Sequence, residues 1–263
     1  MLKSIVTLTL MGATFSAGAV LPPSASTCTC RAQEQASAAL PATKELVAKF
    51  TKASGGAENL QAVKTSIVEG TVKIPSLNFE GEIKILQSAP DHMRMSINLG
   101  PNGTQEQGYN GKVAWTVGPG GAQVLEGAME AQIKLQSRME GFAAIDEYFD
   151  SLETKALVTF EGEDAYEVIC KKEGLADRTI YFAKESGLVL GTTATEEVPP
   201  FGEMKVTTVF SNYEKVGDVV LCKQMEMRLP GMKQIIEFEK IQLNQELPKD
   251  WEKLPKAISS QLR

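Results

Sequence analysis

The chain has 263 residues, of which 43% are hydrophobic and 23% charged, and 27 Lys+Arg against 33 Asp+Glu give a formal net charge of −6. This is the composition of an ordinary globular protein. An acidic balance argues against binding to nucleic acid or to anionic membrane surfaces, because both call for basic patches.

The N-terminus has the layout of a secretory signal. Lys3 is followed by an apolar run that Gly12 and Gly18 interrupt and that ends at Pro22-Pro23, with small residues behind it. This order predicts a signal peptide over 1–26. A transmembrane helix is the alternative, but the glycines and prolines leave too short an uninterrupted span. We therefore expect a periplasmic or secreted protein.

Two cysteines follow directly. Ala25-Ser26-Thr27-Cys28 loosely resembles a bacterial lipoprotein box, in which the cysteine becomes the lipidated N-terminus, so Cys28 is a candidate membrane anchor. Cleavage after Ala19 or after Ser26 fits the sequence equally well. Cys28 and Cys30 are too close together for an easy mutual disulfide.

Cys170 and Cys222 lie in expected strands, where they form either a disulfide or two separate buried thiols. A C-x-C pair and two isolated cysteines without a nearby histidine lack the ligand spacing of a zinc site. We expect neither a metal nor a cofactor.

The polar, alanine-rich stretch that completes residues 27–42 predicts a flexible tether. A helix is expected over 43–53, because Leu46, Val47 and Phe50 share one face at helical spacing. Gly55-Gly56 should end it. The remaining chain, 43–263, has no break in composition and predicts a single domain.

From Thr65 the hydrophobic pattern repeats every two residues, which indicates strands. Apolar and polar residues alternate along two further segments, and this predicts an antiparallel meander with one apolar and one wet face. The apolar positions of these segments are Leu77, Phe79, Ile83 and Ile85, then Met93, Met95, Ile97 and Leu99.

The next strands meet at Asn110-Gly111, a strong signal for a two-residue type I′ hairpin turn. Beyond it, Trp115 and Val117 share one face. A tryptophan there either completes an ordinary core or lines a space for a ligand.

A helical pattern over 125–152, which includes Met129 and Ile133, follows a break at Gly118 to Gly121. A second run of strands then reaches the C-terminus, with reversals at Glu161-Gly162 and similar pairs. The fold class expected is mainly β with helices (α+β): an incomplete antiparallel barrel of about eleven to twelve strands, with an N-terminal helix and a helical lid or plug inserted after strand five.

The residue inventory gives little support to catalysis. His92 is the single histidine and lies on the polar side of an expected strand, so a solvated side chain is the simpler interpretation. No Gly-x-Ser-x-Gly elbow and no phosphate-binding glycine loop is present. Glu161, Glu163 and Asp164 cluster at a turn, as in many solvated hairpin tips. We predict no catalytic residues and no enzyme.

The methionines suggest a different use of the interior. Several fall on apolar strand faces, where their flexible side chains suit either irregular core packing or a wall that fits hydrocarbon. The second interpretation predicts an apolar cavity for the acyl chains of a lipid or lipoprotein. Its expected lining is Phe79, Ile83, Met93, Met95, Ile97, Trp115, Met129, Ile133, Met225 and Met227.

The order of helix, curved sheet, Asn110-Gly111-Lys112-Val113-Ala114-Trp115, helical insert and second sheet resembles the LolA/LolB-like periplasmic lipoprotein-carrier superfamily. The resemblance covers nearly all of 43–255. It implies an incomplete barrel with a helical lid around a lipid-binding cavity that Trp115 faces or borders. In one respect the chain departs from that pattern: Ala89 stands before Pro90, where the carriers have an arginine that latches the lid.

Taken together, these features predict a monomeric carrier or binding protein for a hydrophobic acyl chain, with a role in transport and outer membrane biogenesis. Its partners would be lipid or lipoprotein acyl chains and a membrane-anchored donor or acceptor protein. The alternative hypothesis is an envelope sensor or protein-interaction module on the same fold. A third hypothesis is an enzyme on this fold.

Overall fold

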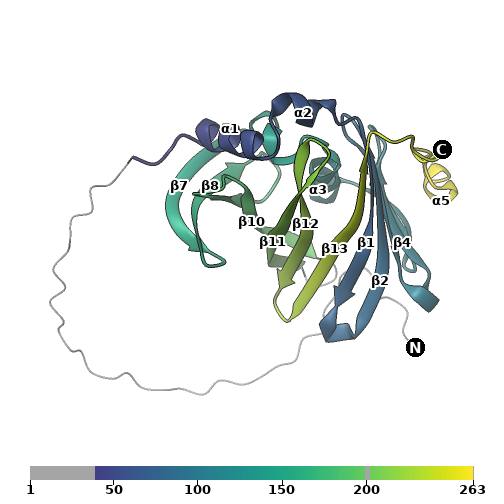
Figure 1. Ribbon diagram of the computed structural model, residues 1–263. Helices are drawn as coiled ribbons and strands as arrows, with labels where there is room; N and C mark the ends of the chain where they lie inside the picture. Colours follow the sequence, from purple (N-terminus) through teal and green to yellow (C-terminus); the bar gives the residue numbers. More distant parts are fainter. Residues whose placement is uncertain (1–38, 199–201, 263) are drawn as a thin grey trace, which may run out of the picture.

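The computed structural model describes residues 39–198 and 202–262. The expected signal peptide, most of the tether, and Cys28 and Cys30 lie outside these residues. Thirteen strands form one sheet in the order β6-β5-β4-β3-β2-β1-β13-β12-β11-β10-β9-β8-β7, and every neighbouring pair is antiparallel. The sheet curls into an open half-barrel (Figure 1), which confirms the expected fold class.

The strands come in two runs that meet where β1 pairs with β13. The first run is β1 (Thr65–Ile74), β2 (Phe79–Ser88), β3 (His92–Asn98), β4 (Thr104–Tyr109), β5 (Ala114–Gly118) and β6 (Gly121–Leu125). The second is β7 (Ser151–Phe160), β8 (Glu163–Lys171), β9 (Arg178–Ala183), β10 (Val189–Val198), β11 (Gly202–Val216), β12 (Val219–Leu229) and β13 (Met232–Leu243).

The helices are short. They are α1 (Thr43–Ala53), α2 (Ala57–Ala62), α3 (Gly127–Ser137), α4 (Ile145–Tyr148) and α5 (Lys256–Ser259), with 3-10 turns η1 (Pro75–Leu77), η2 (Gly100–Asn102) and η3 (Gly141–Ala144). The helical insert therefore follows six strands rather than five. Gly118 pairs with Gly121 across a tight reversal, so the glycines start another hairpin instead of ending the sheet.

Helix α1 has the expected bounds and closes one end of the concave side. Leu46, Val47 and Phe50 are buried. The Phe50 ring meets Phe142 of η3 and Phe182 of β9 edge-on, with centroids 5.9 and 6.3 Å apart. Such aromatic contacts add to the free energy gained by burial.

The hairpin at Asn110 forms, but its turn is not type I′. Gly111 has a positive φ of 83°, whereas the φ of Asn110 is not positive. The Asn110 side-chain oxygen instead accepts hydrogen bonds from the backbone N–H groups of Lys112 (3.2 Å) and Val113 (3.0 Å). This Asx-type bonding widens the loop, so that Tyr109 pairs with Ala114.

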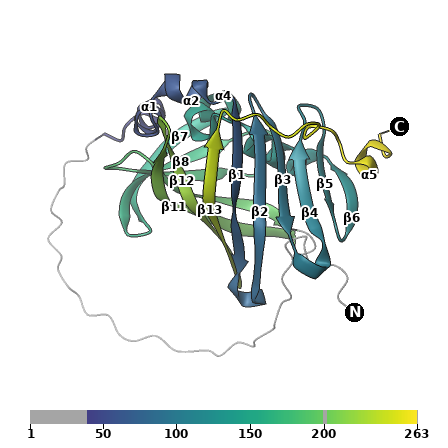
Figure 2. The same cartoon turned by 45° about the vertical axis from the view of Figure 1, so that its right-hand side comes forward.

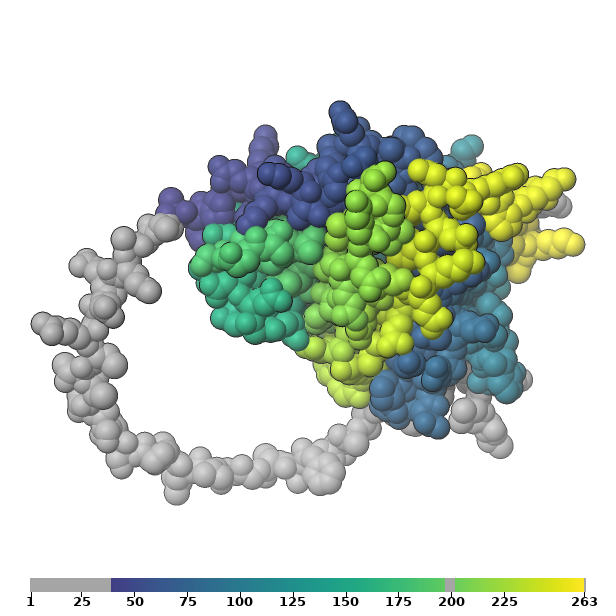
Figure 3. Space-filling model, in the orientation of Figure 1, coloured from purple at the N-terminus to yellow at the C-terminus, as the bar shows by residue number. Residues whose placement is uncertain are grey.

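The C-terminal segment covers the outer side of the first strands. Figure 2 shows it leaving β13 and crossing toward α5, which lies against β5 and β6. In the space-filling view (Figure 3) these residues lie beside the blue strands near the start of the sheet. Ile258 of α5 is completely buried, and the Gln261 side chain donates to the Ala122 carbonyl (2.9 Å). The segment is thus part of the fold.

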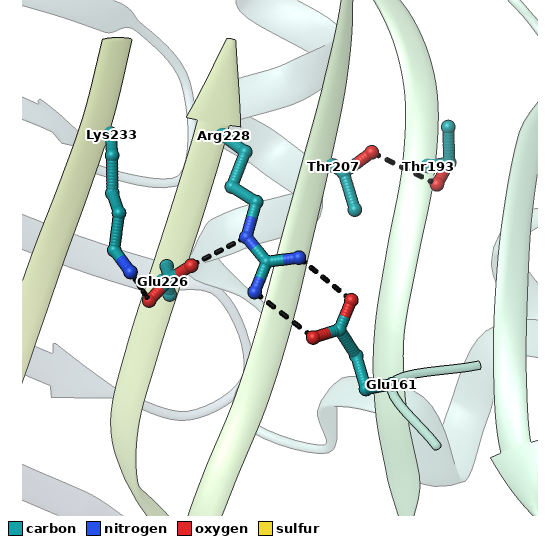
Figure 4. A network of polar contacts seen from close by, with 6 residues as sticks. All are labelled: Glu161, Thr193, Thr207, Glu226, Arg228 and Lys233. Atoms are coloured by element: carbon teal, nitrogen blue, oxygen red, sulfur yellow. Dashed lines mark hydrogen bonds and ion pairs between the residues drawn. The ribbon is translucent and has the colours of Figure 1, made fainter. Parts of the chain in front are cut away.

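A polar network ties the β7–β8 hairpin tip to β12 on the outer side (Figure 4). The Arg228 guanidinium donates to both carboxylate oxygens of Glu161, at 2.7 and 2.9 Å. Its Nε donates to Glu226, which also pairs with Lys233 at 2.5 Å. The acidic turn is therefore more than a solvated tip, since Glu161 makes a bidentate contact with a strand elsewhere in the sheet.

The network makes a testable contribution to stability. Burial alone would raise the pKa of Glu226, but hydrogen bonds from Lys233 and Arg228 outweigh it and lower that pKa below the ordinary 4.5. A lowered pKa in the folded state stabilises the fold above the unfolded-state pKa, and this contribution disappears as the pH falls through the folded-state value. Glu226→Gln should therefore cost about 1 kcal/mol at neutral pH and almost nothing at strongly acidic pH. Urea unfolding at both pH values measures the difference, and an equal effect of Glu163→Gln at the exposed tip would contradict it.

Candidate functional site

Paired residues in a sheet present their side chains to the same face, so the register shows which residues line the concave side. Ile83 pairs with Ile97 and Ile85 with Met95, while Met225 pairs with Ile236. These side chains converge from the two runs of strands. We call the surface that they form the apolar trough; its members are Val72, Ile74, Phe79, Ile83, Ile85, Met95, Ile97, Met204, Val206, Met225, Met227, Leu229, Met232, Ile236 and Phe238.

Most of the predicted lining residues gather here. Phe79, Ile83, Met95, Ile97, Met225 and Met227 belong to the trough. Met93, Met129 and Ile133 lie beside it, in the cluster that α3 makes with β3–β6. Ile85 contacts both groups, so the two surfaces are continuous.

The trough wall is incompletely covered. Ile83 is 2% exposed, but Phe79, Met95, Ile97, Met225 and Met227 are only partly buried. Large apolar side chains that meet on a concave surface and keep some exposure are typical of interaction sites. This distinguishes the trough from the end of the sheet under α1, where Val168, Ile180 and Phe182 are completely buried.

Two hollows on the described surface lie elsewhere. One, of about 300 Å³, is polar and lies between Lys84, Arg94 and Glu106 and the C-terminal segment Pro248 to Trp251. The other, of about 250 Å³, lies at a rim between α2, Pro90 and Met139. Neither is lined by a predicted site residue. Neither hollow therefore provides space for a ligand in the trough.

Helix α3 is the element that packs over the concave side. Ile133 packs against β3–β6 residues, and Lys134 lies over the Tyr109 ring, 5.5 Å from its centroid. On the opposite wall, Gln132 Nε2 donates to Glu196 Oε2 of β10 at 2.7 Å. The helix thus bridges two walls of the half-barrel.

Ala89 makes no comparable link. Its backbone N–H donates to the Lys64 carbonyl (2.9 Å), and a methyl group cannot hydrogen-bond to α3. Other residues hold α3 by polar contacts. Gln132 donates to Glu196, the Tyr148 hydroxyl donates to the Ala131 carbonyl at 3.0 Å, and the amides of Gln87 and Gln107 donate to Gln136.

Trp115 lies on the other face of the sheet. It pairs with Gly108, which in turn pairs with Arg94, whereas the adjacent row of Met93, Tyr109 and Ala114 faces α3. The Arg94 guanidinium lies over the indole, 5.5 Å from its centroid, and also donates to the Trp251 carbonyl. At 3% exposed, Trp115 is buried on the outer face, which the C-terminal segment crosses. It therefore does not join the other predicted lining residues.

Arg178 and Glu196 are two polar residues of the concave side that the sequence patterns did not single out. They form an ion pair of 2.7 Å on the concave side, and their side chains are 20% and 16% exposed. Their positions in the alternating pattern of the strands could have revealed them. Arg178 shares a strand face with Ile180 and Phe182, and Glu196 shares one with Ala194. A charged residue in an apolar row indicates a partner inside the fold.

The structure leaves Cys170 and Cys222 as two unpaired thiols. Burial raises the pKa of Cys170 to about 12 and that of Cys222 to about 11. Both thiols are therefore protonated and unreactive near neutral pH.

Alkylation tests this directly. Iodoacetamide at about pH 8 should leave both cysteines unmodified in the folded protein and modify both after unfolding in urea. Peptide mapping by mass spectrometry resolves each site. Rapid modification of Cys170 in the folded state would show that its strand opens.

His92 lies over the hairpin loop, where a Cβ on Gly111 would come within 3.0 Å of its Nε2. Across residues 39–198 and 202–262, no cluster of three or more His, Cys, Asp or Glu side chains has the arrangement of a metal site. The helices in this same part of the chain are all too short or too polar to cross a membrane.

Comparisons with known proteins give matches in structure alone. No family model matches the sequence, and no curated protein matches it. A DUF1329 family protein from Desulfovibrio piger aligns with a TM-score of 0.58 and 11% identity over 80% of this chain and 96% of that one. A LolA superfamily protein from Nitrosomonas europaea gives 0.54 and 9%, over 79% and 95%.

A Vibrio parahaemolyticus protein named as an outer membrane lipoprotein-sorting protein domain gives a TM-score of 0.51 and 11% identity, over 80% of this chain and 95% of that one. Identities this low establish the fold and no more. The chain therefore has a LolA-like fold, as its order of elements predicted.

Proposed function

We propose that this protein is a periplasmic carrier or binding protein for a hydrophobic acyl chain, which it takes up in the apolar trough beneath α3. The observation that carries the proposal is the set of large apolar side chains that meet there and remain partly exposed. The lipoprotein-sorting relative by fold is consistent with it, as is the signal-like N-terminal sequence.

The energetics suit a protein that must also release its ligand. Burying a methylene gains about 0.8 kcal/mol, so ten or so methylenes gain roughly 8 kcal/mol, which corresponds to about micromolar affinity. The entropy lost on association and the displacement of α3 reduce this figure.

The ends of α3 suit such a displacement. Gly127 starts the helix with a φ of 60°, and Gly141 follows it with a φ of 52°. Glycine adopts these angles without steric cost, so both positions can act as hinges. Movement of α3 about them would uncover the trough without unfolding the sheet.

Native mass spectrometry of protein purified from the envelope tests the proposal. We expect bound lipid that organic solvent extracts, and binding of the uncharged dye Nile red that dodecanol displaces. Repeated absence of lipid together with no dye binding would contradict the proposal.

A protein-interaction module is the second candidate, because β7 is an edge strand and Leu157 on it is 43% exposed. An edge strand offers unpaired backbone groups to an extended peptide. Selective capture of one envelope protein by a wild-type chain that binds no lipid would favour this candidate.

A further inference from the structure

The charges on the concave side are few and already paired. Arg178 and Glu196 face inward beside the trough on β9 and β10, and Lys223, in phase with Met225 on β12, donates to the Glu239 carbonyl at 2.8 Å.

Glu196 uses both of its carboxylate oxygens inside the fold. One accepts from the Arg178 guanidinium and the other from the Gln132 amide of α3, each at 2.7 Å. The ion pair borders the trough, because Glu196 pairs with Met204, and Ala194, opposite Arg178, pairs with Val206. The positive charge of Arg178 is therefore neutralised by its neighbour.

The cationic side chain of Lys134 on α3 also has partners. Lys134 of α3 pairs with Glu130 at 2.6 Å and lies over the Tyr109 ring. A carboxylate or phosphate entering the concave side would thus lose its water without gaining a free cation, which costs several kcal/mol. The remaining polar partners are amides and hydroxyls, such as the Gln105 amide that donates to the Thr116 hydroxyl (2.6 Å).

From this distribution we infer that the trough selects lipids whose buried portion is uncharged, such as long-chain alcohols, acylglycerols or glycolipids, and discriminates against free fatty acids. The inference rests on the proposed function and narrows it. The selectivity comes from the Arg178–Glu196 pair. Because the Arg178 guanidinium is already paired with Glu196, it cannot bind the anionic group of a ligand.

Matched ligands and one substitution test this. Nile red displacement at about pH 8, where a carboxylate is ionised, compares dodecanol with dodecanoate. We expect wild-type protein to bind dodecanol at least about tenfold more tightly, a difference of about 1.4 kcal/mol. Glu196→Gln frees the Arg178 guanidinium, so dodecanoate affinity should rise about tenfold while dodecanol affinity changes little.

Two further variants control for net charge and for folding. Arg178→Gln combined with Glu196→Gln should lose the gained dodecanoate binding, since an uncharged amide pair then occupies the site. Glu153→Gln, which removes a negative charge from the exposed strand β7, should change neither affinity. Circular dichroism verifies that each variant is folded.

The outcomes separate the two proposals. Equal wild-type affinity for dodecanol and dodecanoate, or no gain for dodecanoate in Glu196→Gln, overturns the inferred selectivity and leaves the carrier function standing. Failure of both ligands to bind overturns the carrier function itself.

Discussion

Trp115→Ala should destabilise the fold by about 3–5 kcal/mol and leave lipid binding by the remaining folded protein unchanged. The indole is 3% exposed and lies between the sheet and the Arg94 guanidinium. Its removal leaves a cavity on the outer face and takes the aromatic partner from a cation. The trough, on the opposite face, keeps all its side chains.

Urea unfolding followed by circular dichroism measures the loss, because Trp115 itself cannot then serve as the fluorescent probe. Leu77→Ala is the matched control: Leu77 is 51% exposed and should change stability little. If the Trp115→Ala protein has normal stability but no longer binds Nile red, the prediction is wrong and Trp115 belongs to the ligand site.

The position opposite Trp115 explains part of this expectation. A Cβ on Gly108 would lie 2.9 Å from the indole Cζ2, and 2.5 Å from the Met93 carbonyl oxygen. The indole therefore packs directly over a residue without a side chain. The pair is a structural fit, because a larger residue at position 108 would push the ring away from the sheet.

Met95→Asp should weaken the hydrocarbon binding that we propose. Met95 lies in the trough, where it pairs with Ile85, and it is partly buried. A carboxylate there puts a charge against the path of an acyl chain, and the ligand must then desolvate it. We expect Nile red and dodecanol affinity to fall at least about tenfold, or about 1.4 kcal/mol.

The neighbouring position supplies the control. Ser96 is the next residue of the same strand and faces the outer hollow, beside Lys84 and Arg94. Ser96→Asp adds the same charge to the other face, close to two cations, and should bind lipid like the wild type. Equal losses in the two variants would mean that charge, rather than the trough, governs binding.

Local patterns in the sequence were sufficient for most elements. Leu46, Val47 and Phe50 defined α1 correctly, and the alternation in β2 and β3 placed Ile83, Met95 and Ile97 on one face. Leu77 is the exception. It continues the apolar alternation in the sequence, yet it lies in the exposed turn η1 because β2 begins only at Phe79.

These patterns did not predict which face of a strand lies on the concave side of the sheet. In β5 the larger side chains, Trp115 and Val117, looked like the core side. The structure gives the concave side to Ala114 and Thr116, since α3 needs room there, and buries Trp115 on the outer face. A strand pattern records that a face is apolar but not what covers it.

By itself, the sequence determined the order of the elements, the fold class and the phase of the apolar side chains, because hydrophobic periodicity and turn chemistry act over a few neighbouring residues. Tertiary structure alone decided that Trp115 serves the outer face and that Arg178 meets Glu196 and, through it, Gln132 of α3. Those contacts join segments distant in sequence, and the curl of the sheet is what brings them together.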